Sequence, residues 1–142
     1  MSRVEIALQD GIHFEAVGED GISVSLDSSS EHGGQGAGLR PMQLLLVALG
    51  SCSAMDVISI LRKKRQKVTG YRIEVSGEQA SEYPRVFTQI SIRHVVTGVD
   101  LPETSVQRAI ELSETKYCPA YAMLSKATEI STTFEIVQAP RD

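Results

Sequence analysis

Residues 40–67 read RPMQLLLVALGSCSAMDVISILRKKRQK, and this stretch decides the fold. Pro41 stands where the first turn of a helix tolerates proline, and the next proline is Pro84, so the stretch predicts one long helix. Residues 44–49 are apolar on every side of that helix, a pattern typical of a helix that is buried all round. Cys52 lies in the middle of this helix and is the first candidate functional residue.

The composition is that of a globular domain. The chain has 142 residues, of which 42% are hydrophobic and 23% are charged, and a chain of this length buries about two-thirds of its unfolded surface. We therefore expect a single domain over residues 1–142. The net charge of −4 disfavours a nucleic-acid binder. The basic residues at 62–67 fit the end of a helix, where cations complement the helix dipole.

We expect a cytoplasmic protein. The N-terminus reaches polar residues at once, with neither a basic segment nor an apolar one after it, so it predicts no signal peptide. Residues 42–61 are about long enough to cross a bilayer, but Gln43 and Asp56 interrupt them, which disfavours a membrane role. In a reducing compartment the two cysteines will be thiols, and any bridge between them will be transient.

Alternating apolar and polar residues predict strands on both sides of the long helix. Residues 3–26 predict a three-stranded antiparallel meander with one buried face. After the helix, the pattern predicts a hairpin whose second strand runs from about Val86 to Thr97, then a helix after Pro102 and a last strand. This order predicts an α+β fold in which antiparallel sheets cover the helices. The residues on which these predictions depend most are Val4, Ile6, Leu8, Phe14, Ala16, Ile22, Val24, Leu26, Val106, Ala109, Ile110, Ser113, Ile130, Thr132, Phe134 and Ile136.

Cys118 is followed by Pro119 and is the second candidate functional residue. If Pro119 is the first helical residue, Cys118 is the N-cap, where free N–H groups and the helix dipole lower the pKa of a thiol. Taken alone, each cysteine also fits an inert small apolar side chain. The residues around Cys52 are small (Gly50, Ser51, Ser53 and Ala54), which would let a substrate or another chain approach it closely.

Two other kinds of site are disfavoured. The glycine-rich residues 33–38 precede a helix, as a phosphate-binding loop does, but they lack the dinucleotide spacing and the parallel βαβ context. His13, His32 and His94 show no metal-ligand spacing with each other or with the cysteines, so we expect no metal site.

The combination of Arg40-Pro41-Met42-Gln43-Leu44-Leu45-Leu46, Leu49-Gly50-Ser51-Cys52, Lys63-Lys64-Arg65 and Cys118-Pro119 resembles the OsmC/Ohr superfamily of osmotically inducible and organic hydroperoxide resistance proteins. The match covers nearly the whole chain, including the order of the elements. The resemblance implies an intertwined homodimer in which wrapped sheets enclose the two central helices.

The resemblance also implies a chemistry. Cys52 would attack an organic hydroperoxide to give a sulfenic acid and an alcohol, and Cys118 would resolve the sulfenic acid as a disulfide. An external dithiol of the lipoyl type would reduce that disulfide, with no bound cofactor. The hypothesis is therefore thiol-dependent hydroperoxide reduction in oxidative-stress defence.

One position departs from the family pattern. The peroxidase branches carry a glutamate just after the helix-starting proline, paired with an arginine from an upstream loop, whereas Met42 and Gln43 stand here. Residues 27–39 contain no arginine, so Arg40 is the candidate polarising residue, with Gln43 beside it. At a helical rise of about 1.5 Å per residue, Arg40 lies roughly 18 Å from its own Cys52, so it would act across the dimer interface. The missing carboxylate also favours an alternative: a non-catalytic member of this fold that binds a small apolar molecule.

Overall fold

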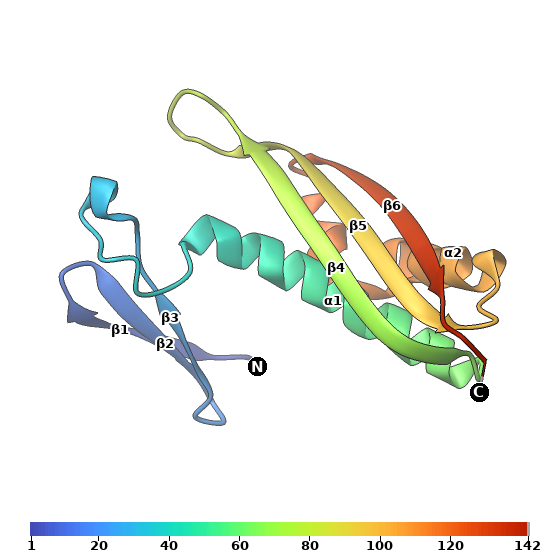
Figure 1. Cartoon of the computed structure of the whole chain (residues 1–142). Coiled ribbons are helices and arrows are strands. Elements are labelled where there is room, and N and C mark those ends of the chain that lie inside the picture. The colour runs from blue at the N-terminus through green and yellow to red at the C-terminus, as the bar shows by residue number, and fades with distance from the viewer. Residues whose placement is uncertain (142) are drawn as a thin grey trace. The chain divides into compact units, whose positions relative to one another are not determined.

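The computed structural model describes residues 1–141 and divides into two compact units, the first over Met1–Leu45 and the second from Leu46 onward. The long helix α1 (Pro41–Lys63) contributes residues to both units (Figure 1). Pro41 is its first residue, as predicted. That residues 1–142 form one domain stays a prediction.

The first unit contains the predicted antiparallel meander. It consists of β1 (Val4–Asp10), β2 (His13–Gly18) and β3 (Ser23–Leu26), in that order. The register pairs Ile6 with Ala16 and Ala16 with Val24, so the predicted apolar residues do share a face. The prediction that this face is buried is wrong for the single chain, because the side chains of Ile6 and Leu8 are 59% and 58% exposed. Three strands form one layer, and a layer cannot cover its own face.

The glycine-rich loop after β3, which includes the short helix η1 (Ser30–His32), folds around Asp27. The Asp27 carboxylate accepts hydrogen bonds from the backbone N–H groups of Ser28 (2.7 Å), Gln35 (3.2 Å) and Ala37 (3.1 Å). These bonds hold the pKa of Asp27 below its usual value. Because the loop directs these N–H groups at its own carboxylate, they are not free to hold a phosphate.

The second unit contains a mixed sheet. Strands β4 (Lys67–Gln79) and β5 (Phe87–Val99) form a long antiparallel hairpin, and β6 (Glu129–Gln138) pairs with β5 in parallel. The prediction of purely antiparallel sheets is wrong at β6. The chain leaves β5, crosses through α2 (Glu103–Leu112), η2 (Ser113–Tyr117) and α3 (Pro119–Leu124), and returns in the direction of β5. Such a helical crossover is the connection that parallel strands need.

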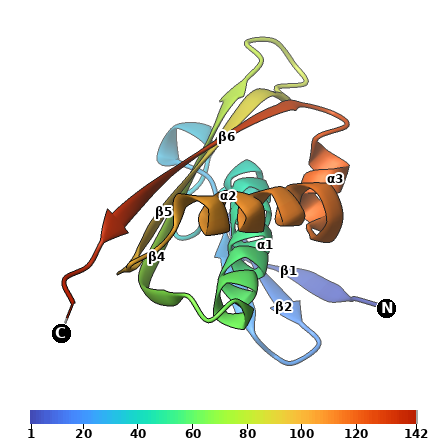
Figure 2. The same cartoon turned by 90° about the vertical axis from the view of Figure 1, so that its right-hand side faces the viewer.

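Helices α1 and α2 lie on the same face of this sheet (Figure 2). The predicted helical face of α2 is buried. The main cluster joins α1, β5 and α2 through Val57, Leu61, Val96, Leu101, Val106, Ala109 and Ile110, and a second cluster joins Leu49 to Ile90 and Ile92. These clusters hold the middle of α1 against the sheet.

The prediction that α1 is buried all round is wrong for the single chain. Its buried residues are Leu49, Gly50, Ser53, Val57 and Leu61. From Gly50 onward they recur every three or four positions, so they form one stripe. Leu45, Val47 and Met55 are 41%, 47% and 69% exposed, because the sheet covers one side of the helix. The helix also ends at Lys63 and not near residue 67, and Arg65 takes a left-handed backbone conformation with φ of 58°.

Candidate active site

Cys52 lies in the middle of α1 and is partly exposed. Two of its small neighbours are buried within the protein's own fold. A Cβ at Gly50 would lie 2.7 Å from Cγ2 of Val75 in β4, and Ser53 is 1% exposed. The small size of Gly50 is therefore explained by close packing of α1 on the sheet, whereas Ser53 is buried with its hydroxyl 3.4 Å from that of Ser113. Approach by a substrate is not needed to explain either residue.

Cys118 lies between two helical segments. The N–H of Cys118 donates to the carbonyl of Ser113 (2.8 Å), a bond that closes the single π-helical turn η2. Pro119 is the first residue of α3, and the Cys118 sulfur accepts the N–H of Tyr121 at 3.3 Å. The predicted N-cap position of Cys118 is confirmed. Single π-helical turns often occur at functional sites.

The predicted direction of the Cys118 pKa is wrong. The side chain is 3% exposed, and burial raises the pKa of the thiol to about 11. The hydrogen bond from Tyr121 opposes this shift, whereas Cys52 and the charge of Asp56 add to it. The sequence predicts the capping that lowers the pKa of Cys118. It does not predict the burial that raises this pKa by more, because that burial depends on how η2 and α3 pack.

The structure brings the two cysteines together. Cys52 lies near enough to Cys118 to help raise the pKa of its thiol, although 66 positions separate the two residues in the sequence. Both are free thiols. A thiol pair on neighbouring elements is the arrangement that disulfide chemistry needs.

A polar contact joins α1 to the segment that carries Cys118. The hydroxyl of Ser113 donates to Oδ2 of Asp56 (2.9 Å) and lies 3.4 Å from the hydroxyl of Ser53. Ser113 is fully buried. The sequence places Asp56 four residues after Cys52, on the same helix face. It did not indicate that Ser113 would be the hydrogen-bond partner of Asp56, because helical spacing predicted Ser113 as an ordinary core residue.

A second polar group lies between η2, α3 and β6. Glu114 accepts a hydrogen bond from the hydroxyl of Thr132, and burial raises the pKa of its carboxyl. Burial also raises the pKa of Tyr121, and the nearby charge of Glu114 adds to that shift. No periodicity in the sequence marked Glu114, because a π-helical turn rotates residues away from positions that α-helical spacing predicts.

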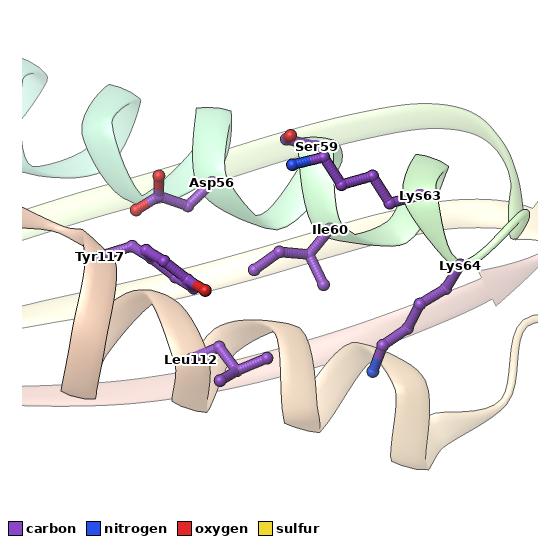
Figure 3. A pocket seen from close by; sticks show the side chains of 7 residues that line it. All are labelled: Asp56, Ser59, Ile60, Lys63, Lys64, Leu112 and Tyr117. Atoms are coloured by element: carbon purple, nitrogen blue, oxygen red, sulfur yellow. The ribbon is translucent and has the colours of Figure 1, made fainter.

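A pocket of about 310 Å³ opens between α1 and the α2–η2 segment. In Figure 3, the Tyr117 ring, Ile60 and Leu112 face the space between the helices, and Lys64 reaches toward α2. Ser59 and Lys63 complete the lining. Neither cysteine lines the pocket. Two of the lining residues connect the pocket with the thiols. The charge of Asp56 raises the pKa of Cys118, and Tyr117 directly precedes Cys118 in the chain.

The other two predicted site residues lie at the start of α1. The side-chain oxygen of Gln43 accepts the backbone N–H of Arg40 at 3.0 Å, as the third residue of a helix does in a capping box. Both side chains are exposed. Gln43 therefore has a structural explanation, while a role for Arg40 across a subunit interface stays a prediction. Within residues 1–141 there is no group of three His, Cys, Asp or Glu side chains that could hold a metal ion.

Comparison with known proteins shows the family of this chain. A family model described as OsmC-like protein matches residues 33–133. The chain belongs to the OsmC-like family, within the OsmC/Ohr superfamily. The protein YhfA of Escherichia coli is 40% identical over 130 residues, which are 92% of this chain and 94% of YhfA.

Solved structures of OsmC-like fold superimpose on nearly the whole chain. A protein of Aquifex aeolicus is 31% identical with a TM-score of 0.87, and the match covers 99% of this chain and 98% of that one. The organic hydroperoxide resistance protein OhrB of Bacillus subtilis is 15% identical with a TM-score of 0.64, covering 95% and 98%. The second likeness shows the fold alone. The fold class and the family predicted from the sequence are both confirmed.

Proposed function

We propose that this OsmC-like protein reduces organic hydroperoxides through Cys52 and Cys118 in peroxide or stress defence. The observation that carries the proposal is that Cys52 lies near enough to Cys118 to help raise the pKa of its thiol. The fold shared with proteins described as organic hydroperoxide resistance proteins supports the same chemistry.

The reaction has three balanced steps. The Cys52 thiol gives up its proton and the thiolate attacks the outer oxygen of the hydroperoxide. The O–O bond breaks, Cys52 becomes a sulfenic acid, and the alkoxide takes up the proton released by Cys52 and leaves as the alcohol. Cys118 then attacks the Cys52 sulfur and releases water, which leaves a Cys52–Cys118 disulfide. An external dithiol of the lipoyl type reduces this disulfide and is itself oxidised to a disulfide. Arg40 of a second subunit is the candidate group that polarises the peroxide.

We expect the protein to work as a homodimer in the cytoplasm. The exposed apolar side chains of β1 and α1 support the dimer, because a soluble monomer seldom exposes so many apolar groups on regular elements.

Mass spectrometry tests the reaction directly. Reduced protein treated with one equivalent of cumene hydroperoxide should lose two hydrogens as the Cys52–Cys118 disulfide forms. In Cys118→Ser, dimedone should trap a sulfenic acid on Cys52, and Cys52→Ser should react with neither reagent. If Cys52 of the wild type stays a free thiol while a known peroxidase is oxidised beside it, the proposal is wrong.

A binding function is the second candidate. It is favoured by the pocket of about 310 Å³, whose apolar side chains Ile60 and Leu112 lie beside Lys63 and Lys64, and by the neutral Met42 and Gln43. Two results together would favour binding over catalysis. Peroxide would leave Cys52 of the wild type unoxidised, and small apolar acids would stabilise the Cys52→Ser variant against thermal unfolding.

A further inference from the structure

Asp56 is tied to both cysteine-bearing segments. It follows Cys52 by four residues, so both side chains lie on the same face of α1. Its Oδ2 accepts the hydroxyl of Ser113 at 2.9 Å, and the carbonyl of the same Ser113 accepts the N–H of Cys118 at 2.8 Å. One fully buried serine therefore fixes Asp56 relative to the residue that resolves the sulfenic acid.

Asp56 also has access to solvent, because it lines the pocket between α1 and η2 (Figure 3). Asp56 supplies the carboxyl group of that pocket, which Lys63, Lys64 and Tyr117 also line. The titratable and charged groups that face this region from all the packed elements are Cys52, Lys63, Lys64, Glu114, Tyr117, Cys118 and Tyr121. Among these, Glu114 is held by Thr132 on β6.

We infer that Asp56 is the proton-transfer residue of disulfide formation between Cys118 and the oxidised Cys52. This inference rests on the proposed function, since it assigns the proton movement of the resolving step. Ser113 is the matching positioning residue: it occupies one carboxylate oxygen and leaves the other free for the proton.

The resolving step needs such a residue. With burial raising the pKa of the Cys118 thiol to about 11, the attacking thiolate is scarce at neutral pH. Hydroxide is also a poor leaving group. As the S–S bond forms, Asp56 accepts the proton from the Cys118 sulfur and passes it to the oxygen that leaves Cys52. The oxygen departs as water, the S–O bond is broken, and Asp56 is again a carboxylate.

The variant that tests this is Asp56→Asn, which keeps an oxygen able to accept the Ser113 hydroxyl but cannot carry a proton. Once Cys52 has been oxidised, we expect the Cys52–Cys118 disulfide to form about 100-fold more slowly in Asp56→Asn than in the wild type. A loss of this size is typical when a general acid–base group is removed. Dimedone should then trap Cys52 sulfenic acid in this variant and not in the wild type. Glu111→Gln, which removes an exposed carboxylate on α2, should behave as the wild type.

The pH profile separates proton transfer from a structural effect. Between about pH 6 and pH 9 the wild-type resolving rate should be nearly flat. In Asp56→Asn it should rise about tenfold per pH unit, because the Cys118 thiolate must form from bulk solvent. Asp56→Glu should restore much of the rate. If disulfide formation in Asp56→Asn is slower than in the wild type by the same factor at every pH, the inference is wrong. It is also wrong if the disulfide forms in Asp56→Asn at the wild-type rate.

A second reaction tests Asp56 without a peroxide. When excess glutathione disulfide reacts with reduced protein, Cys52 attacks it, keeps one glutathione as a mixed disulfide and releases the other as a thiol. Cys118 then attacks the Cys52 sulfur and expels the second glutathione thiol, with the same proton to move. We expect the mixed disulfide to accumulate in Asp56→Asn and not in the wild type. If peroxide leaves Cys52 unoxidised but the mixed disulfide still accumulates only in Asp56→Asn, the proposed function is wrong and the assignment of Asp56 stands. If the mixed disulfide accumulates to the same extent in both proteins, the assignment of Asp56 is wrong.

Discussion

At the scale of single residues, His94 is a buried titratable group with a strongly shifted pKa. It is fully buried in β5, its Nδ1 shares a hydrogen bond with the Tyr71 hydroxyl at 2.6 Å, and its Nε2 has no partner among the described residues. Burial lowers the pKa of His94 to about 4 and raises the pKa of Tyr71. The protein therefore keeps a neutral imidazole in its core.

This burial predicts an acid-sensitive fold. Because the pKa of His94 is about 4 when folded and near 6.5 when unfolded, the unfolded chain binds more protons between these values. Stability should thus fall as the pH drops from 6.5 to 4, and by the lower limit His94 should account for a loss of about 3 kcal/mol. Urea unfolding of the wild type and of His94→Gln at pH 7 and pH 4.5 measures this, and the variant should lose less.

The control is His32→Gln, which removes an exposed histidine of the same chain. Its pH dependence should match that of the wild type, since other groups with shifted pKa values, such as Asp27, are untouched in all three proteins. An equal acid loss in the wild type and in His94→Gln would show that His94 is not the cause.

Residue-level prediction from the sequence succeeded where the cause is local. The N-cap position of Cys118 follows from the proline after it, and the N-cap is present. The predicted direction of the Cys118 pKa was wrong because this pKa depends on burial by segments distant in the sequence. The α1 residues Cys52 and Asp56 add to the shift. Ser113 and Glu114 were missed as site residues for the same reason.

At the scale of elements, the position of α1 depends on Gly50. A glycine inside a helix costs about 1 kcal/mol relative to alanine, so an isolated helix would gain from Gly50→Ala. In the protein the new Cβ would lie 2.7 Å from Cγ2 of Val75, a β-branched side chain with little rotational freedom. We expect the overpacking to outweigh the helical gain and to destabilise the protein by about 1 kcal/mol, measured by urea unfolding.

A double-mutant cycle isolates this contact. Val75→Ala removes the methyl group that the new Cβ would meet, so Gly50→Ala should stabilise the protein when it is made in the Val75→Ala background. If Gly50→Ala has the same effect in both backgrounds, then close approach to Val75 is not the reason for the glycine.

The elements themselves were predictable to different extents. Alternation located β1 to β3 and the apolar face of β6, because a strand with one apolar face has a period of two. The parallel pairing of β6 was not visible, since pairing direction depends on the crossover through α2, η2 and α3 and not on the strand itself. The burial of α1 was overestimated because an apolar sequence does not say whether the same chain or another one covers it.

At the scale of the whole molecule, large apolar side chains remain exposed on β1 and on α1, among other elements. Ile6 on β1 is 59% exposed and Met55 on α1 is 69% exposed. The outer face of the sheet β4–β5–β6 differs, because Arg93 there pairs with Glu74 and Glu135. A stable interface buries about 1,200–2,000 Å² and has an apolar centre, so the exposed faces of β1 and α1 are the surfaces that a second copy would cover.

This assignment predicts which substitutions separate the subunits. Met55→Asp and Ile6→Asp would each bury a carboxylate in an apolar interface, so we expect the dimer dissociation constant to rise at least about 100-fold in sedimentation velocity experiments over a range of concentrations. Val137→Asp places the same charge on an exposed valine of the ion-paired sheet face and should leave the dimer intact. Because Arg40 would serve the other subunit's Cys52, separated subunits should also lose peroxide reduction while Cys52 remains open to alkylation. A wild type that sediments as a monomer at micromolar concentration would contradict both the interface and the role of Arg40 in the partner's site.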